Sequence, residues 1–211
     1  RDTAVDGILG EETDVYKKTV GRVNHLTLDG FVIQYAVKEI ARYMAQPRQG
    51  NWLLLKRLAM YLLGAPRLVH AFEWQNRETH LSVYTDSDWA GDKVSRKSTS
   101  GGIVFMGSHA IKSWSKNQSI IALSSAEAEY YALTKGAAYC LGVQSLYTDW
   151  KMDIPIELFC DSSSARTFAK RRGLGKNRHI DTRCLWLQER IALKHLKLFS
   201  VPTTDNPADL F

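Results

Sequence analysis

The chain has 211 residues, of which 45% are hydrophobic and 24% charged, a balance that excludes an intrinsically disordered protein. No apolar run approaches the roughly 20 residues of a membrane span, and the polar start at Arg1 does not resemble a signal peptide. A net charge of +6 and a pI of about 9.2 favour an anionic partner, most commonly nucleic acid. Because the chain lacks an initiator Met, we expect it to be a piece of a longer protein.

The first part of the chain is predicted to be mainly helical. The apolar positions Phe31, Val32, Tyr35, Ala36, Ile40 and Tyr43 form one stripe at helical spacing. Pro47 and Gly50 are expected to end that helix. The predicted elements here are a helical stretch from Val15, helices at 31–43 and 52–63, and a strand at 68–74.

The pattern changes near residues 76–78, where short β-like runs begin, separated by turn-rich segments. The predicted elements are strands at 81–85, 102–106 and 110–114, a long helix at 125–150, a strand at 156–160, helical segments at 163–170 and 181–193, a strand at 196–201 and a helix start at 206–207. This order predicts a mixed α/β fold, in which an antiparallel meander joins parallel strands through helical crossovers.

Two acidic residues stand where strands of such a sheet end. Asp86 closes the first strand of the second half, and Asp161 closes the strand at 156–160. The carboxyl ends of neighbouring strands form the usual ligand crevice of α/β sheets. Each residue also has a structural alternative, because Asp86 or Asp88 could form an Asx turn and Asp161 could cap the following helix.

Helix geometry distinguishes two glutamates at the start of the long helix. Ser124 and Glu127 form a capping-box pattern, which assigns Glu127 a structural role. Glu129 lies about 200° further around the helix and is followed by apolar residues, so a bound metal would offset the cost of burying its carboxylate. Asp209 stands three residues after a helix-start Asn206, and it could serve only that start.

Carboxylates that converge in one crevice repel each other and raise one another's pKa, and a divalent ion removes that repulsion. Oxygen ligands with few His or Cys partners point to Mg²⁺ or Mn²⁺ rather than Zn²⁺. Two such ions can activate a water and stabilise the leaving oxygen in an in-line attack on a phosphodiester. The three cysteines (Cys140, Cys160, Cys184) fit no zinc or disulfide pattern, and we expect them to be buried in a reducing compartment.

Seven strings in one order carry a family resemblance from about Val83 to Phe211. They are YTDSDWAGD (84–92), RKSTSGG (96–102), SWSK (113–116), SSAEAEY (124–130), CD (160–161), RHID (178–181) and ADLF (208–211). Together they resemble the RNase H domain of copia-type retrotransposon polyproteins. The resemblance implies an RNase H-like fold, with a mixed five-stranded sheet flanked by helices, over 78–211. It also implies cleavage of the RNA strand of RNA/DNA hybrids with two Mg²⁺ ions, Mn²⁺ being possible.

The same resemblance assigns the catalytic and metal-binding residues by motif. The acids are Asp86, Glu129, Asp161 and Asp209. It implies as partners an RNA/DNA hybrid and the remainder of the polyprotein, reverse transcriptase and integrase, with no membrane. The implied location is intracellular, in a cytoplasmic virus-like particle with possible nuclear access.

Residues 1–77 resemble the end of the reverse transcriptase, its thumb and connection, less closely. Matching strings are VYKKTVG (15–21), YAV (35–37), RYMAQP (42–47) and KRLAMYLLG (56–64), whereas VNH (23–25) and LDGFV (28–32) depart from the family pattern. The paired-Asp polymerase motif is absent from the sequence, so we expect no polymerase activity from this chain.

A basic segment supplies candidate contacts to phosphates. Residues 161–190 contain eight Lys or Arg and three Asp or Glu. The candidates for nucleic-acid binding are Arg171, Arg172, Lys176, Arg178 and His179. The alternative is a solvated linker, with His179 an ordinary loop histidine.

A non-catalytic module is the alternative to a nuclease. The altered upstream strings fit a decayed element or a scaffold that only holds hybrid. The chain also ends two residues after Asp209. We therefore expect a shortened terminal helix that holds Asp209 weakly.

Overall fold

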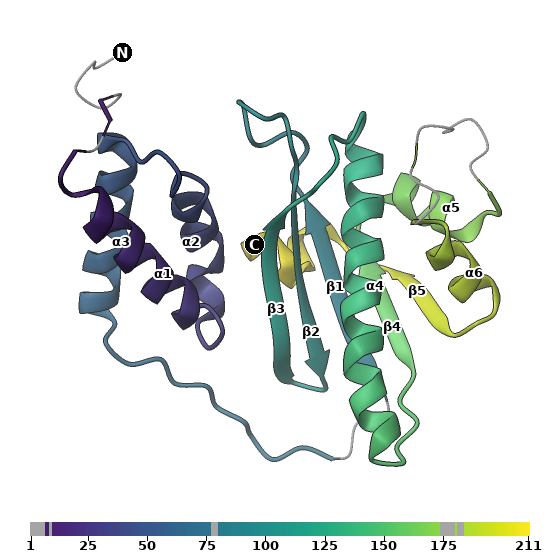
Figure 1. Cartoon of the computed structure of the whole chain (residues 1–211). Coiled ribbons are helices and arrows are strands. Elements are labelled where there is room, and N and C mark those ends of the chain that lie inside the picture. The colour runs from purple at the N-terminus through teal and green to yellow at the C-terminus, as the bar shows by residue number, and fades with distance from the viewer. Residues whose placement is uncertain (1–6, 9, 77–79, 174–179, 181–183) are drawn as a thin grey trace. The chain divides into compact units, whose positions relative to one another are not determined.

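The computed structural model describes the whole chain except residues 1–6, 9, 77–79, 174–179 and 181–183. It forms two compact units, Arg1–Phe72 and Glu73–Phe211 (Figure 1). Among the described residues, no helix combines the length and apolar character that crossing a membrane requires.

The first unit is helical, as expected. It consists of α1 (Thr13–Leu26), a short 3₁₀ turn η1 (Phe31–Ile33), α2 (Gln34–Ala41) and α3 (Gln49–Gly64). The buried Tyr16 hydroxyl donates a 2.7 Å hydrogen bond to the Ile40 carbonyl and so ties α1 to the end of α2. The predicted helix at 31–43 is shorter than expected at both ends, and Gly50 lies inside α3 rather than ending a helix.

The strand predicted at 68–74 is wrong. These residues form no regular structure, and their large apolar side chains, including Val69 at 81% and Trp74 at 88% exposure, face solvent. Apolar composition alone suggested a strand, but a strand is stable only when a neighbour accepts its hydrogen bonds.

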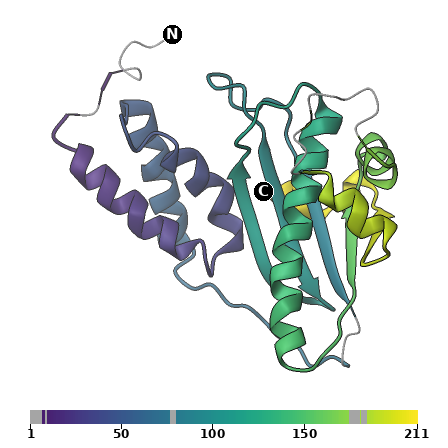
Figure 2. The same cartoon turned by 45° about the vertical axis from the view of Figure 1, so that its right-hand side comes forward.

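The second unit is a five-stranded mixed sheet with flanking helices, which confirms the predicted RNase H-like class. Its elements are β1 (Leu81–Ser87), β2 (Thr99–Met106), β3 (His109–Asn117), α4 (Ser125–Asp149), β4 (Ile156–Cys160), α5 (Ser163–Lys170), α6 (Trp186–Ala192), β5 (Leu196–Ser200) and the 3₁₀ turns η3 (Thr203–Asp205) and η4 (Pro207–Leu210). The strand order is β3-β2-β1-β4-β5. Figures 1 and 2 show α4 lying along one face of the sheet, with the C-terminal turns on the other.

The pairing of β1 places the ends of several strands at one edge. β1 runs antiparallel to β2 and parallel to β4, and β4 runs parallel to β5. The carboxyl ends of β1, β4 and β5 therefore point the same way. Helix α4 packs closely on this sheet at Gly136, where an added Cβ would lie 2.5 Å from the Thr85 side chain.

Candidate active site

Strand β1 and the end of β4 bring two of the predicted acids to one edge of the sheet. Asp86 is the last residue but one of β1, and Asp161 directly follows β4. Burial raises the pKa of Asp86 to about 6, and the negative charges of Asp209 and Asp161 add to that rise. The three carboxylates are thus near enough to repel one another.

Glu129 enters the same site from the first turns of α4. Its carboxylate accepts a 3.1 Å hydrogen bond from the Ser87 amide at the end of β1, and the side chain is only 8% exposed. Its second oxygen, Oε2, is buried and has no hydrogen-bond partner among the residues that the structure describes. Burial, followed by repulsion from Asp86 and Asp161, raises the pKa of Glu129 to about 9. A bound cation would stabilise the charged form of a carboxylate placed in this way.

The Asp161 side chain does not cap helix α5 and is held by other contacts. Ser162 is the N-cap of α5, because its hydroxyl accepts from the Ala165 amide at 3.2 Å. The Asp161 carboxylate instead accepts a 2.8 Å hydrogen bond from the Thr203 hydroxyl on the turn after β5. The Arg166 guanidinium donates to the Asp161 carbonyl at 2.6 Å, which fixes the backbone there. The capping alternative for Asp161 is therefore wrong.

The two acids set aside on sequence grounds have structural partners. The Glu127 carboxylate accepts hydrogen bonds from the Leu123 amide at 2.9 Å and the Tyr131 hydroxyl at 2.7 Å, while the Glu127 amide donates to Ser124 at 3.2 Å. The capping pattern is thus confirmed, although its return bond reaches Leu123 rather than Ser124. The Asp88 carboxylate accepts from the Thr99 amide and holds the start of β2.

Asp209 lies on a 3₁₀ turn, and that turn is held more firmly than expected. The buried Asn206 donates to the Thr85 carbonyl of β1 at 3.2 Å and accepts from the Ala208 amide at 3.2 Å. The Ser115 hydroxyl of β3 donates to the Phe211 carbonyl at 2.6 Å. The expectation of a weakly held Asp209 is therefore wrong. Burial and the Asp161 charge raise the pKa of the Asp209 carboxyl, although the residue remains exposed.

We expect Asn206→Ala to lower the free energy of unfolding by about 1–2 kcal/mol, because one buried acceptor and one turn cap lose their partner. Urea unfolding measures this change, and Thr204→Ala, on the exposed part of the preceding turn, is the control. Equal stability of both variants would show that Asn206 does not anchor the turn.

Several residues of the site were missed from the sequence. Cys160, Glu129 and Asp161 place a sulfur and two carboxylate oxygens within 4.8 Å of one another, a group compatible with a metal. Burial raises the pKa of the Cys160 thiol to about 12, so the thiol stays protonated and is a poor ligand for a hard ion. Thr203 and Ser87 carry no local signal, since their roles arise only from strands that are distant in sequence. All three cysteines are buried, as predicted.

The predicted basic contacts are only partly within the described residues. Arg171 follows α5, and its guanidinium lies 4.2 Å from the centre of the Phe168 ring. Arg172 is exposed. Lys176, Arg178 and His179 lie outside the described residues. The structure therefore brings together the four acids, and of the basic set it describes Arg171 and Arg172.

Comparisons with known proteins relate the chain to transposon polyproteins. It is 30% identical over 198 residues to the retrovirus-related Pol polyprotein from transposon RE2 of Arabidopsis thaliana, covering 92% of this chain and 14% of the relative. It is 31% identical over 180 residues to the Pol polyprotein from transposon TNT 1-94 of Nicotiana tabacum, covering 84% of this chain and 13% of the relative. The chain thus spans about one seventh of these relatives.

No protein-family model matches the chain. Among solved structures, it is similar to LC11-RNase H1, isolated from compost, at 17% identity and a TM-score of 0.43, over 62% of this chain and 91% of that one. The matches to the transposon polyproteins extend across both units, and these relatives are of the copia type. The chain is thus similar, over 84% or more of its length, to a segment of the Pol polyproteins of copia-type retrotransposons.

Proposed function

We propose that the second unit is a ribonuclease H that hydrolyses the RNA strand of RNA/DNA hybrids with two Mg²⁺ ions. The observation that carries this proposal is the convergence of Asp86, Glu129, Asp161 and Asp209, where burial, followed by mutual repulsion, raises the pKa of Asp86, Glu129 and Asp209. Similarity to the Pol polyproteins supports the same reaction. The proposal divides the chain into two parts: the end of a reverse transcriptase at 1–77 and an RNase H-like domain at 78–211.

The residues present fit a hard divalent cation. The unpartnered Oε2 of Glu129 and the carboxylates of Asp86 and Asp161 offer oxygen ligands without imidazole or thiolate. The bound ions would activate a water molecule and neutralise charge on the leaving oxygen. Mn²⁺ has similar ligand preferences and is expected to substitute for Mg²⁺.

The chain's own residues act by holding these oxygens in place. The Ser87 amide fixes Glu129 against the end of β1, and the Thr203 hydroxyl orients the Asp161 carboxylate. No side chain in the four-acid cluster needs to act as a nucleophile. The protein therefore contributes carboxylates that are already held in position. The bound cations and the phosphodiester substrate would complete the site.

The test is cleavage of a labelled RNA/DNA hybrid with Mg²⁺. We expect cleavage by the unmodified chain, loss of cleavage with EDTA, and loss in Asp161→Asn, which keeps the side chain's size while removing its charge. Duplex DNA of the same sequence is the control substrate and should stay intact. Hybrid that remains whole after prolonged incubation with Mn²⁺ would refute the enzymatic proposal, and hybrid binding without cleavage would favour a scaffold.

Affinity for Mg²⁺ is expected to rise with pH. In the metal-free protein, the pKa values of Asp86 and Glu129 are raised to about 6 and about 9, so protons compete with the ion below these values. Raising the pH from 6 to 8 should therefore strengthen binding by about twofold through Asp86 and by up to about 100-fold through Glu129, if both protons leave on binding. Isothermal titration with Mg²⁺ in buffers of different ionisation enthalpy measures both the affinity and the protons. Binding that is independent of pH would contradict the assignment of these ligands.

The relatives support a setting within a Pol polyprotein. The proposed partners there are the remaining reverse transcriptase and an integrase. The proposed cellular location is a cytoplasmic virus-like particle with access to the nucleus. Arg171, Arg172, Lys176, Arg178 and His179 are the proposed contacts to the hybrid's phosphates.

A further inference from the structure

Strand β3 and helix α4 present three lysines around one aromatic ring. On β3, Lys112 and Lys116 lie two residues before and two residues after the buried Trp114. All three side chains are therefore on the same face of the strand, the one toward α4. The ammonium groups of Lys112 and Lys116 lie 4.6 Å and 5.8 Å from the centre of the Tyr139 ring. Lys135 is one helical turn before Tyr139 and shares its side of α4. We call Lys112, Lys116 and Lys135 the β3–α4 lysines.

Lys135 is unusual among these lysines because it is half-buried next to another cation. Burial, followed by repulsion from Lys116, lowers its pKa to about 8. Within the described part of the chain, it makes no ion pair or hydrogen bond. Burial and the neighbouring cation both disfavour the charged form of Lys135. A bound external anion would offset both effects.

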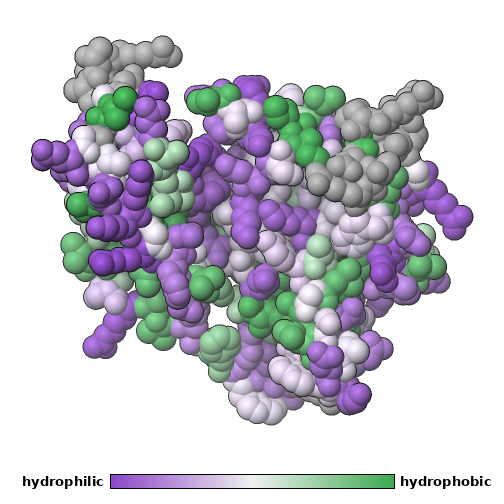
Figure 3. Space-filling model, in the orientation of Figure 1, coloured by the Kyte–Doolittle hydropathy of each residue, from purple (hydrophilic) through white to green (hydrophobic). Residues whose placement is uncertain are grey.

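The surroundings of the β3–α4 lysines contain no compensating acid in the sequence. Residues 93–126 carry five Lys or Arg and no Asp or Glu, and residues 130–148 of α4 carry Lys135 and again no acid. Figure 3 shows hydrophilic side chains in the middle of this face, over β3 and the adjacent side of α4. The basic side chains of these two stretches therefore have no acidic counterpart within either stretch.

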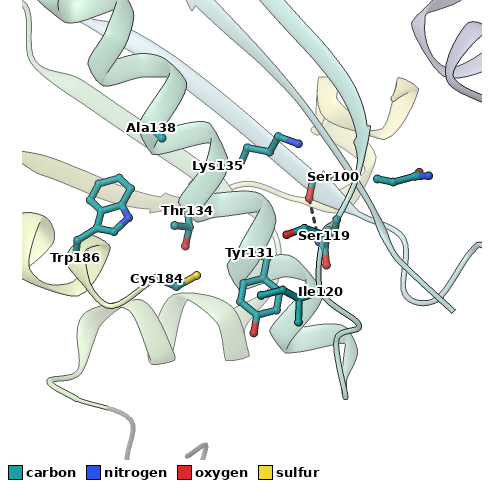
Figure 4. Close-up of a pocket in the computed structure, with 11 residues that line it drawn as sticks. Ser100, Ser119, Ile120, Tyr131, Thr134, Lys135, Ala138, Cys184 and Trp186 are labelled. Carbon is teal, nitrogen blue, oxygen red and sulfur yellow. Dashed lines mark hydrogen bonds between the residues drawn. The ribbon is translucent and has the colours of Figure 1, made fainter. Parts of the chain in front are cut away.

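A cavity of about 370 Å³ opens beside Lys135. It is lined by Ser100, Asn117, Gln118, Ser119, Ile120, Tyr131, Thr134, Lys135, Ala138, Cys184 and Trp186. In Figure 4, Lys135 extends from α4 toward the strand that carries Ser100. Gln118, only 7% exposed, donates to Ser100 at 2.9 Å. The cavity therefore offers the Lys135 ammonium and the Ser100 hydroxyl to a ligand that carries anionic oxygens.

The cavity is close to the acids but separate from them. Ser100 pairs with Ser87 on one side and with Lys116 on the other. Since neighbouring strands lie about 4.8 Å apart, Lys116 is about 10 Å from the end of β1. That separation is on the order of three base-pair steps, given about 3.4 Å of axial rise per base pair.

We infer that the β3–α4 lysines and the adjoining cavity bind the phosphodiester backbone of the nucleic-acid duplex beside the cleavage site. This surface deepens the proposed nuclease function and is separate from the predicted basic segment at 171–179. The contacts are to phosphates and sugars, so the surface holds the duplex without reading its sequence. Duplex DNA and hybrid are therefore both expected to bind there.

The test compares two triple variants of the whole chain. Lys112→Gln, Lys116→Gln and Lys135→Gln together remove the face, whereas Lys151→Gln, Lys194→Gln and Lys197→Gln remove three exposed lysines elsewhere in the same unit. Binding of a fluorescent hybrid is measured by anisotropy with EDTA, over a range of salt concentrations. We expect the first variant to bind about 10- to 100-fold more weakly, with a slope of log K against log salt shallower by about 2 to 3. The control variant should lose less than about threefold in affinity.

The outcomes separate this inference from the nuclease proposal, because the binding assay contains no metal. A face variant that matches the control in affinity and salt slope would overturn the inference, even if the unmodified chain cleaves hybrid. Weakened binding by the face variant supports the inference, even if the unmodified chain does not cleave. If the unmodified chain binds neither hybrid nor duplex DNA, the surface does not serve nucleic acid, and an acidic protein partner would replace it. The single variant Lys135→Gln should show part of this loss of affinity for the hybrid, while its melting temperature stays unchanged.

Discussion

Asp86→Asn is expected to reduce Mg²⁺-dependent hybrid cleavage by at least about 10³-fold, the scale on which a preorganised electrostatic contact acts in catalysis. Asp86 is the acid of β1, and its carboxylate is raised in pKa by burial and by the charges of Asp209 and Asp161. Asn preserves the shape and one acceptor oxygen but removes the negative charge that a cation would neutralise. The loss should therefore fall on the metal-dependent step and not on folding.

Asp88→Asn is the matched control for Asp86, because the two residues are two positions apart. The Asp88 carboxylate accepts from the Thr99 amide, and an Asn side-chain oxygen can accept the same bond. We expect cleavage within about threefold of the unmodified chain, as for a change outside the reacting groups. Measuring kcat and KM on one hybrid distinguishes the two variants. Equal losses at both positions would remove Asp86 from the proposed ligand set.

Glu129→Gln is expected to abolish cleavage and at the same time to stabilise the metal-free protein. Burial and neighbouring carboxylates raise the pKa of Glu129 from 4.5 to about 9. Between these values the folded state holds a proton that the unfolded state has released, so stability falls as pH rises across that window. Gln does not titrate and can still accept from the Ser87 amide through its side-chain oxygen. We expect the metal-free melting temperature at pH 8 to rise by about 5 °C or more.

The size of this effect depends on pH, and Mg²⁺ acts against it. At pH 4 both forms of the chain carry a neutral side chain at this position, and the difference in melting temperature should largely disappear. Adding Mg²⁺ should stabilise the unmodified chain but not Glu129→Gln, because only the former binds the ion tightly. Calorimetry at the two pH values, with and without Mg²⁺, gives all four comparisons.

Glu127→Gln is the control on the same helix turn. Its carboxylate accepts from both the Leu123 amide and the Tyr131 hydroxyl, and Gln can satisfy only one of these donors through its oxygen. We expect a loss of about 1–2 kcal/mol in stability with cleavage retained. A stabilised Glu127→Gln, or a destabilised metal-free Glu129→Gln, would reverse the roles assigned to the two residues.

Helices and strands of the second unit could be predicted from local sequence, because nearby residues mark where these elements begin and end. The strand at 156–160 and the helix at 163–170 agree with the observed β4 and α5, where a β-rich run meets a serine cap. The strand expected at 68–74 failed because its apolar residues suggested pairing that no neighbouring strand supplies. Local sequence predicts a tendency to extend, but only a partner strand satisfies the backbone.

Motif order and residue chemistry, by themselves, determined the fold class, the family resemblance and the four acids. They also separated Glu129 from Glu127, because helix caps and helix faces depend on nearby residues. Only the tertiary structure decided that Ser162 rather than Asp161 caps α5, and that Asn206 ties the last turn to β1. It also brought Lys116 and Lys135 together from two elements. The physical reason is that burial and repulsion between distant residues depend on packing, and packing is a property of the folded chain.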